Sequence, residues 1–432
     1  MAFLYVDGHV RVYHGKRTIP KAHVARMRLA MPATTDYWIN DQSGDPLFVM
    51  TASANAGMVK MLPDVLTQVR QLIGDRRVTV VFDRGGWSPK LFQKLLDNHF
   101  DILTYRKGKT RCIGAHRFVL RIAKIDGCSV EYRLHDQAVR FLKGKLRLRQ
   151  VTRLSEDGQH QTPIVTSRWD LSTIEVAYRM FARWRQENFF KYLREEFMLD
   201  ALTDYQIEPD DPTRTVPNPK RRVLDKAIRS ARVEVAKLEQ AYGAAALDNP
   251  EERRPTMRGF KIAHGKTGKE LRAARDRLAE LLARRRALPE RVEVRDVSDS
   301  AVVKLTTERK HLTNIIKMLA YQAESDLVAF LTPHYARTNE EGRTLLHALF
   351  RAAADIEVTD AELRVTLRPL SSPHRTVAVQ ALCDTLTETA TTFPGSSLRL
   401  RFAIHPPPRI GLAFPRPRLK PDPQPASPPP AT

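Results

Sequence analysis

The chain opens with apolar and polar positions arranged first as strands and then as a helix. Residues 3–13 carry β-branched and aromatic side chains on both sides of Asp7-Gly8, which predicts two strand segments joined by a tight turn. Residues 34–52 continue with short strand segments around a polar turn, so we expect three antiparallel strands to open the domain. Residues 57–73 then place apolar side chains on one stripe at helical spacing, which predicts an amphipathic helix.

A continuously apolar run follows at residues 77–86, RVTVVFDRGG, and it ends at Asp83. Such a run is typical of a strand that is buried on both faces. A helix at 88–99 and a strand at 101–105 continue the alternation, so the predicted fold class is α/β. Ligands bind at the carboxyl ends of the strands in such sheets, which makes Asp83 a stronger candidate for chemistry than Asp7, because a hairpin turn alone would explain Asp7.

The pattern changes between residues 114 and 168, where apolar and charged positions alternate with the period of half-exposed antiparallel strands. We interpret this segment as a β-rich insertion that follows the last strand of the core. The stretch 172–197, STIEVAYRMFARWRQENFFKYLREEF, returns to a helical pattern. It predicts one helix with Glu187 near its centre.

Three cations share a face of that helix with Glu187. Arg183 lies four residues before it, Lys191 four residues after it and Arg194 seven residues after it. One interpretation is a solvated face of ion pairs. The other is a carboxylate that works beside phosphate groups, and the helix alone does not decide between them.

The second half of the chain predicts a basic helical arm. Residues 208–219 are proline-rich and have the composition of a linker. Apolar residues then recur at steps of four and three over 224–242 and again over 271–288, so two helices joined by a loop at about 243–267 should form an antiparallel hairpin. Six lysine and arginine residues lie between 220 and 232, and they serve either as phosphate contacts or simply as a soluble face. The candidates for DNA contact are Lys220, Arg221 and Arg222.

These patterns divide the chain into several parts. They are an α/β core at 1–113 and 169–207, a β-rich insertion at 114–168, a linker and basic helical hairpin at 208–292, a small α+β module at 293–405, and a disordered proline-rich tail at 406–432. The α+β module is predicted from helices at 305–332, 340–354 and 375–390, a hairpin at 356–368 and a strand at 398–404. We assign no chemistry to this module.

Charge narrows the choice of partner. The chain has 71 lysine and arginine residues against 49 acidic ones, a net charge of +22. Such an excess favours a polyanionic partner, of which nucleic acid is the commonest, although charge alone does not separate DNA from RNA or from an acidic protein.

Composition also bears on location and on thiol chemistry. No stretch approaches the roughly 18 apolar residues that a membrane span needs. The start, MAFLYVDGHV, lacks the basic lead and the long apolar run of a secretory signal, so we expect a cytoplasmic protein with no membrane partner. Cys112, Cys128 and Cys383 lie far apart and form no CxxC pair, so we expect ordinary thiols rather than a zinc site.

The order of elements is that of a ribonuclease H-like mixed sheet, in which the first strand, the fourth strand and a late helix converge. Asp7, Asp83 and Glu187 occupy those three elements. Phosphodiester chemistry uses two Mg²⁺ ions about 3.5–4 Å apart to stabilise the attacking and leaving oxygens. Magnesium prefers hard oxygen ligands, and three carboxylates on rigid elements can hold two ions.

These motifs resemble those of the DDE transposases of bacterial insertion sequences. The matching residues are VDG around Asp7, FDRGGW around Asp83 and RWRQENFFKYLREE around Glu187. The branch that the chain resembles most has a β-rich insertion before the glutamate helix and a motif of tyrosine, two residues, arginine, three residues, glutamate, six residues and lysine. The corresponding positions here are Met180, Arg183, Glu187 and Arg194, while Asp83, Arg84 and Gly85 match the aspartate-arginine-glycine of the second motif. The resemblance covers about residues 3–205.

The resemblance implies nicking at a transposon end, followed by attack of the freed 3′-hydroxyl on target DNA. It implies that Asp7, Asp83 and Glu187 bind two Mg²⁺ ions, with Mn²⁺ as a substitute. The implied partner is double-stranded DNA, both transposon ends and target, with a homodimer as one option for assembly. The implied phosphate contacts are Arg84, Arg183, Lys191 and Arg194. Trp87 and Trp184 are interpreted as packing residues rather than as platforms for a flipped base.

One departure from the family leaves other functions open. Only six residues precede Asp7, whereas family members usually carry a DNA-binding segment before the first catalytic strand. The resemblance therefore describes a chain that lacks that segment. The alternatives to a transposase are a ribonuclease H-like metal-dependent nuclease, which cuts without joining, and an inactive, truncated DNA-binding remnant.

Overall fold

The computed structural model describes residues 2–17, 19–24, 27–52, 56–108, 110–202, 205–247, 257–297 and 301–406, without the side chains of 257–263. The chain divides into two compact units, 1–319 and 320–432. We describe each unit by itself. The boundary falls inside helix α7 (Glu308–Leu331).

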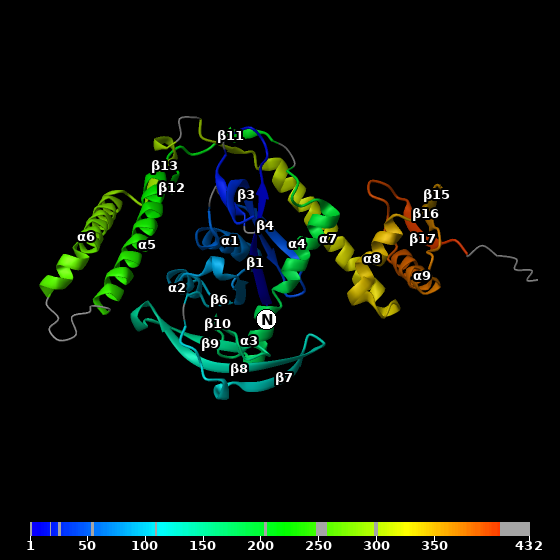
Figure 1. Cartoon of the computed structure of the whole chain (residues 1–432). Coiled ribbons are helices and arrows are strands. Elements are labelled where there is room, and N and C mark those ends of the chain that lie inside the picture. The colour runs from blue at the N-terminus through cyan, green and yellow to red at the C-terminus, as the bar shows by residue number, and fades with distance from the viewer. Residues whose placement is uncertain are drawn as a thin grey trace, which may run out of the picture. The chain divides into compact units, whose positions relative to one another are not determined.

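Within the described residues, one mixed sheet of ten strands dominates the first unit (Figure 1). The strands are β1 (Ala2–Val12), β2 (Lys21–Val24), β3 (Leu29–Asn40), β4 (Pro46–Thr51), β5 (Val78–Phe82), β6 (Phe100–Tyr105), β7 (Val119–Ile125), β8 (Cys128–Phe141), β9 (Leu146–Leu154) and β10 (Gln161–Thr166). Their order is β2-β3-β1-β5-β6-β10-β9-β8-β7, with β4 on β3. Strands β1, β5 and β6 are mutually parallel and the other pairings are antiparallel, which confirms the predicted α/β class.

The two faces of the sheet bury different helices because successive side chains of a strand point to opposite sides. In β1, Leu4 and Val6 pack in one core cluster with the apolar stripe of α1 (Met58–Ile73) and with α2 (Pro89–Asp97). Phe3 and Tyr5 pack in a second cluster with α3 (Thr173–Phe181). Strand β5 is buried along its whole length, as its continuously apolar sequence predicted.

The predicted turn at Asp7-Gly8 is wrong, because β1 runs through it without interruption. Residues Tyr5 to Val12 pair in continuous register with β3. A Cβ on Gly8 would lie 3.0 Å from a ring carbon of Tyr37, so this glycine serves close packing between neighbouring strands rather than a turn. The strand β2, which follows β1 and pairs with β3, was not predicted.

The predicted single helix at 172–197 is also wrong. It is divided into α3 and α4 (Trp184–Phe197), with Ala182 and Arg183 between them. At this junction the backbone tightens to bonds that span three residues, from Arg185 N to Ala182 O and from Gln186 N to Arg183 O, both at 3.0 Å. The break precedes the predicted charged face, because Arg183 is the N-cap of α4 and Glu187, Lys191 and Arg194 all lie within α4.

Strands β7 to β10 have the antiparallel pairing predicted for residues 114–168. They are continuous with the rest of the sheet because β10 pairs with both β9 and β6. The predicted insertion is thus part of the same sheet as the core strand β6.

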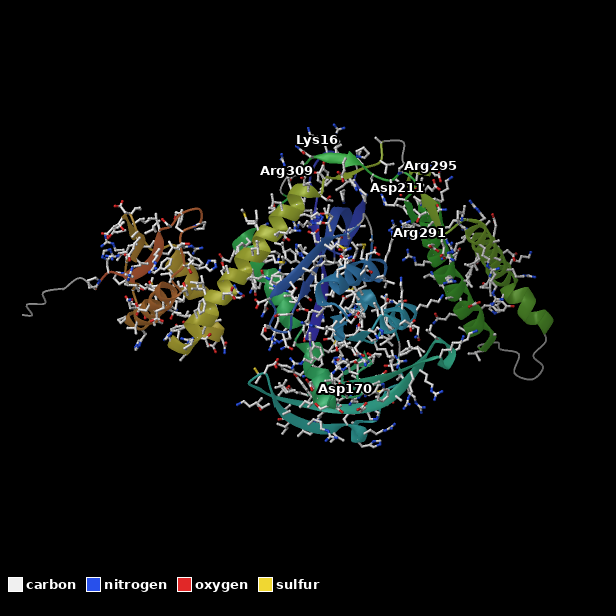
Figure 2. The ribbon with its side chains drawn as sticks, turned by 180° about the vertical axis from the view of Figure 1, so that it is seen from behind. Lys16, Asp170, Asp211, Arg291, Arg295 and Arg309 are labelled. Carbon is white, nitrogen blue, oxygen red and sulfur yellow. The ribbon has the colours of Figure 1, made fainter. Side chains whose placement is uncertain are left out.

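The predicted proline-rich linker at 208–219 contains two short strands. The segment comprises β11 (Ile207–Pro209) and β12 (Thr215–Pro217), which pair with β14 (Val303–Leu305) and β13 (Arg291–Glu293) respectively. Each ladder has only two strands, so proline's missing N–H is tolerated at their edges. We call these two short ladders, β11–β14 and β12–β13, the stem. Figure 2 labels Asp211, Arg291 and Arg295 along it.

The stem carries the predicted antiparallel hairpin, formed by α5 (Pro219–Leu247) and α6 (Met257–Ala287). Both helices extend into the range predicted as loop, of which 248–256 lies outside the described residues. Val235, Leu271 and Ala274 are buried between the helices, and Arg275 pairs with Glu239 at 2.7 Å. The heptad seam is therefore confirmed.

The second unit contains the predicted helices and hairpin. Its elements are the end of α7, α8 (Thr338–Phe350), β15 (Ala354–Val358), β16 (Glu362–Leu367), α9 (Pro373–Glu388) and β17 (Arg399–Ile404). Strand β16 pairs antiparallel with β15 and parallel with β17, and a compact cluster that includes Leu345, Val379 and Leu382 forms the core. The proline-rich tail lies outside the described residues after Pro406. In the part of the chain that the structure covers, no helix is long and apolar enough to cross a membrane.

The first half of α7 is fixed to the sheet by a buried charge cluster. Asp36 on β3 is fully buried and lies 2.8 Å from both Arg11 of β1 and Lys310 of α7. Thr51 donates to the same carboxylate at 2.9 Å, and Asn314 bonds to Arg11. Burial by itself would raise the pKa of Asp36, but the charges of Lys310 and Arg11 outweigh it and hold the pKa below its usual value.

We expect Asp36→Asn to lower the free energy of unfolding by about 3–5 kcal/mol, because it leaves two buried cations without their shared anion. Asp64→Asn, on the exposed side of α1, should change it by no more than about 0.5 kcal/mol. Urea denaturation measures both. Because the pKa of Asp36 is lowered on folding, its stabilisation is complete above the unfolded-state pKa of about 4 and is lost as the pH falls below it. Equal stability of the two variants would contradict this assignment.

Candidate active site

Asp7 and Asp83 are brought side by side by the parallel pairing of β1 and β5. Val6 is the register partner of Phe82, so the next residue on each strand is an aspartate. Both aspartates follow the strand alternation of Tyr5 and Val81, which face the α3 side of the sheet. The two carboxylates therefore lie where the parallel β1–β5 pairing ends, on one face of the sheet.

The turn after β5 fixes the orientation of Asp83. Its Oδ1 accepts a hydrogen bond from Gly85 N at 2.7 Å, and its backbone carbonyl accepts one from the Thr104 hydroxyl at 3.2 Å. A Cβ on Gly86 would lie 2.5 Å from the buried ring of Phe82, so only glycine fits at the end of this short 3₁₀ turn (Arg84–Gly86).

Arg183 links Asp7 to Glu187. Its Nη1 lies 3.3 Å from Asp7 Oδ2 and its Nη2 lies 3.4 Å from Glu187 Oε1. The guanidinium is buried at the α3–α4 junction, while the side chains of Asp7 and Glu187 are 22% and 66% exposed. Asp7 and Glu187 thus share one arginine, with Glu187 in the first turn of α4 and open to solvent.

The charges at this site are strongly coupled. Burial raises the pKa of Asp7, Arg183 opposes that shift and the nearby charge of Asp83 adds to it. Burial alone would lower the pKa of Arg183, but Asp7 and Asp83 raise it above its usual value. The two carboxylates repel each other and attract one buried guanidinium, so a cation bound between them stabilises the site.

The donor chemistry of the site fits magnesium, although its present geometry is not that of a closed metal site. Among the residues that the structure describes, no group of three histidine, cysteine, aspartate or glutamate side chains is arranged to hold an ion. Asp7, Asp83 and Glu187 nevertheless offer only carboxylate oxygens, which magnesium prefers. In the arrangement seen here, Arg183 supplies the positive charge between Asp7 and Glu187.

The residues predicted to contact DNA near the site differ in exposure. Arg84 is exposed, with its guanidinium carbon 5.8 Å from the centre of the Tyr105 ring. Lys191 is exposed on α4, and Arg194 is partly exposed and donates to the Phe190 carbonyl at 3.2 Å. These three can reach a phosphate, whereas Arg183 is buried among the carboxylates.

The three arm residues also divide into two kinds. Lys220 and Arg222 are exposed at the start of α5. Arg221 pairs with Glu290 at 3.1 Å and donates to the Leu288 carbonyl at 3.4 Å, so it joins the two ends of the hairpin. Its position indicates a structural role.

The two tryptophans near the acids have different environments. Trp87 packs edge-on against Phe92 and Phe141, with ring centres 5.2 and 5.7 Å apart, as expected of a packing residue. Trp184 is 54% exposed at the start of α4, so the packing interpretation is wrong for it.

One polar residue in the site was not predicted. Gln186 is 1% exposed, and its amide nitrogen donates to the carbonyls of Tyr5 and Trp38 and to the Asn40 side chain. The sequence contained a signal, because Gln186 shares the helical face of Phe189 and Phe190, which are core residues. A polar residue on a buried face requires partners.

The fold and the site define an α/β protein with two carboxylates where the parallel pairing of β1 and β5 ends, beside a buried arginine and on a strongly basic chain. A family model described as "transposase protein" matches residues 1–405, and the chain belongs to this family. Membership supports a transposase role, which implies an enzyme that cleaves or joins DNA. No match to the chain is found among curated proteins.

We expect Gly86→Ala to lower the free energy of unfolding by about 1–3 kcal/mol, because the added methyl group would overlap the buried Phe82 ring and approach the Met58 sulfur at 3.1 Å. Gly57→Ala is the matched control, since a Cβ there meets nothing within 4 Å. Thermal unfolding of both variants tests the close approach. A Gly86→Ala protein as stable as Gly57→Ala would show that the turn after β5 is not packed as described.

Proposed function

We propose that this transposase is of the DDE type and uses two Mg²⁺ ions, held by Asp7, Asp83 and Glu187, to cut transposon ends and join the 3′-hydroxyl to target DNA. The observation that carries the proposal is the register of β1 and β5, which sets Asp7 beside Asp83, with Arg183 connecting Asp7 to Glu187. Family membership supplies the reaction class.

Each residue has a separate task in this reaction. Bound magnesium supplies the positive charge that activates the attacking oxygen and stabilises the leaving oxygen. Asp83 offers an oriented carboxylate, because its turn is fixed by Gly85 N–H. Arg183 neutralises the paired carboxylates and keeps Asp7 and Glu187 in proximity. Arg84, Lys191 and Arg194 position the phosphates on either side of the reacting bond.

The topology supports the proposal of a ribonuclease H-like core, and the sequence motifs support the proposal of an origin in a bacterial insertion sequence. Strand β1 pairs antiparallel with β3 and parallel with β5, and β6 continues the parallel part of the sheet. A β-rich segment then precedes the helix that carries Glu187. This order agrees with the resemblance of the three sequence motifs to DDE transposases.

The basic hairpin provides a second DNA-binding surface in this proposal. Lys220 and Arg222 are exposed where the hairpin leaves its stem, and both can contact phosphates. We propose double-stranded DNA, both transposon ends and target, as the partner, with two copies of the chain acting together on a pair of ends.

We expect Asp83→Ala and Glu187→Ala to lower Mg²⁺-dependent nicking of a supercoiled plasmid by about 100-fold or more, since loss of a ligand weakens metal binding and transition-state stabilisation together. Replacement of Mg²⁺ by Mn²⁺ should retain activity, and removal by a chelator should abolish it. Asp64→Ala is the control, because Asp64 lies on the exposed side of α1.

A duplex that matches the DNA flanking the gene, with a free 3′-hydroxyl, separates the candidate activities. A transposase joins this duplex to a target plasmid, whereas a nuclease nicks the plasmid without joined products. Nicking that is unaffected in Asp83→Ala would reject the proposed metal site.

We expect the double substitution Lys220→Ala with Arg222→Ala to reduce the slope of log affinity against log salt by about 2, because each phosphate contact on duplex DNA contributes about 0.9. Arg275→Ala is the matched control, because Arg275 is engaged with Glu239 between the two helices. Fluorescence anisotropy with a duplex oligonucleotide at several salt concentrations measures the slope. An unchanged slope in the double variant would remove the arm from the DNA interface.

A further inference from the structure

The amide of Gln186 lies where α4 meets the two strands beside Asp7. We propose that Gln186 is a positioning residue that sets the place of the Glu187 carboxylate relative to Asp7, an inference that rests on the proposed function of these acids. The hydrogen bonds of Gln186 go to β1 and β3 rather than to either carboxylate, so its action is through the backbone of α4.

The hydrogen bonds of Gln186 connect α4 to both strands. Its Nε2 lies 3.0 Å from Tyr5 O on β1, and 3.2 Å from Trp38 O and 2.9 Å from Asn40 Oδ1 on β3. Trp38 is the register partner of Asp7, and Tyr5 precedes Asp7 by two residues on the same face. The acceptors therefore surround the strand position that presents Asp7.

The orientation of the amide is fixed by its partners. Asn40 donates its own amide to the Gly44 carbonyl at 2.9 Å, which leaves its Oδ1 as the acceptor for Gln186. The Oε1 of Gln186 is buried without a hydrogen-bond partner among the described residues. All of the polar anchoring thus passes through the nitrogen, and it is directed at β1 and β3.

The other contacts at the start of α4 do not reach the backbone of β1 or β3. Its N-cap residue, Arg183, makes no side-chain capping bond and contacts the carboxylates of Asp7 and Glu187, while Arg185 donates to the Gln42 carbonyl and to the Tyr178 hydroxyl. Tyr5 holds the other side of the junction, since its hydroxyl donates to the Arg179 carbonyl at 3.0 Å. Tyr5 and Gln186 together therefore fix the chain on both sides of the break between α3 and α4.

The consequence for the site is geometric. Glu187 follows Gln186 directly, and its side chain is open to solvent apart from the contact with Arg183. A shift of the first turn by about 1 Å would move the carboxylate out of register with Asp7 and Asp83, an error that active sites tolerate poorly. Partners of metal-binding residues typically change metal affinity by about 10–100-fold when they are removed.

The test is the affinity of the full-length protein for Mn²⁺, measured by titration calorimetry. We expect Gln186→Met to weaken Mn²⁺ binding by about tenfold. Gln150→Met is the matched control: Gln150 is also a buried glutamine, donates to Thr152 and accepts from Arg106, but lies in β9. It should lower the melting temperature without changing Mn²⁺ affinity.

A double-variant comparison distinguishes positioning from general destabilisation. In a Glu187→Ala background, Gln186→Met should have no further effect on Mn²⁺ affinity, because the carboxylate that it positions is absent. Asn40→Ser, which removes an acceptor and leaves Gln186 in place, should weaken binding in the same direction. This second variant decides the matter if Gln186→Met does not fold.

Two failures have different meanings. If the Glu187→Ala variant binds Mn²⁺ as tightly as the wild-type protein does, the proposed function itself is rejected. A loss of affinity in Glu187→Ala together with wild-type affinity in Gln186→Met and Asn40→Ser would overturn only the role of Gln186.

Discussion

The parallel pairing of β1 with β5 is the constraint on which the rest of the site depends. It sets Val6 opposite Phe82 and therefore delivers Asp7 and Asp83 to the same face of the sheet, where this pairing ends. Two carboxylates so placed repel each other, and burial raises the pKa of Asp7 further. Such an arrangement persists only with a cation nearby, and Arg183 provides one from the junction of two helices. The same repulsion between Asp7 and Asp83 would favour binding of a divalent metal ion, which links the fold to the proposed chemistry.

Neighbouring helices hold strands β1 and β3 in place with buried polar contacts as well as apolar packing. Gln186 attaches α4 to β1 and β3, and Asp36 attaches α7 to the same two strands through Arg11 and Lys310. Buried polar groups of this kind are directional, so they define register where apolar contacts would allow sliding. Helices α4 and α7 are thus both fixed to the strand that carries Asp7.

Local patterns in the sequence were sufficient for much of the fold. The apolar run before Asp83 predicted a strand buried on both faces, and the heptad seam predicted the helical hairpin. Asp7-Gly8 misled because the same dipeptide serves a turn or a close strand contact, and only the pairing with β3 decides between them. The break at Ala182-Arg183 and the donors of Gln186 depend on partners distant in sequence. The contact of Arg183 with Asp7 could not be predicted either. Helical spacing placed Arg183 near Glu187 on α4, but it contained no information about the distant strand that carries Asp7.

The central claim is that Asp7, Asp83 and Glu187 bind divalent ions together. Anomalous scattering at the manganese edge, from crystals of the protein soaked in Mn²⁺, tests it most directly. The account predicts anomalous peaks in contact with the carboxylates of Asp7 and Asp83, with Glu187 turned from Arg183 toward a metal. Manganese bound only elsewhere on the chain, with Arg183 still joining Asp7 to Glu187, would contradict it.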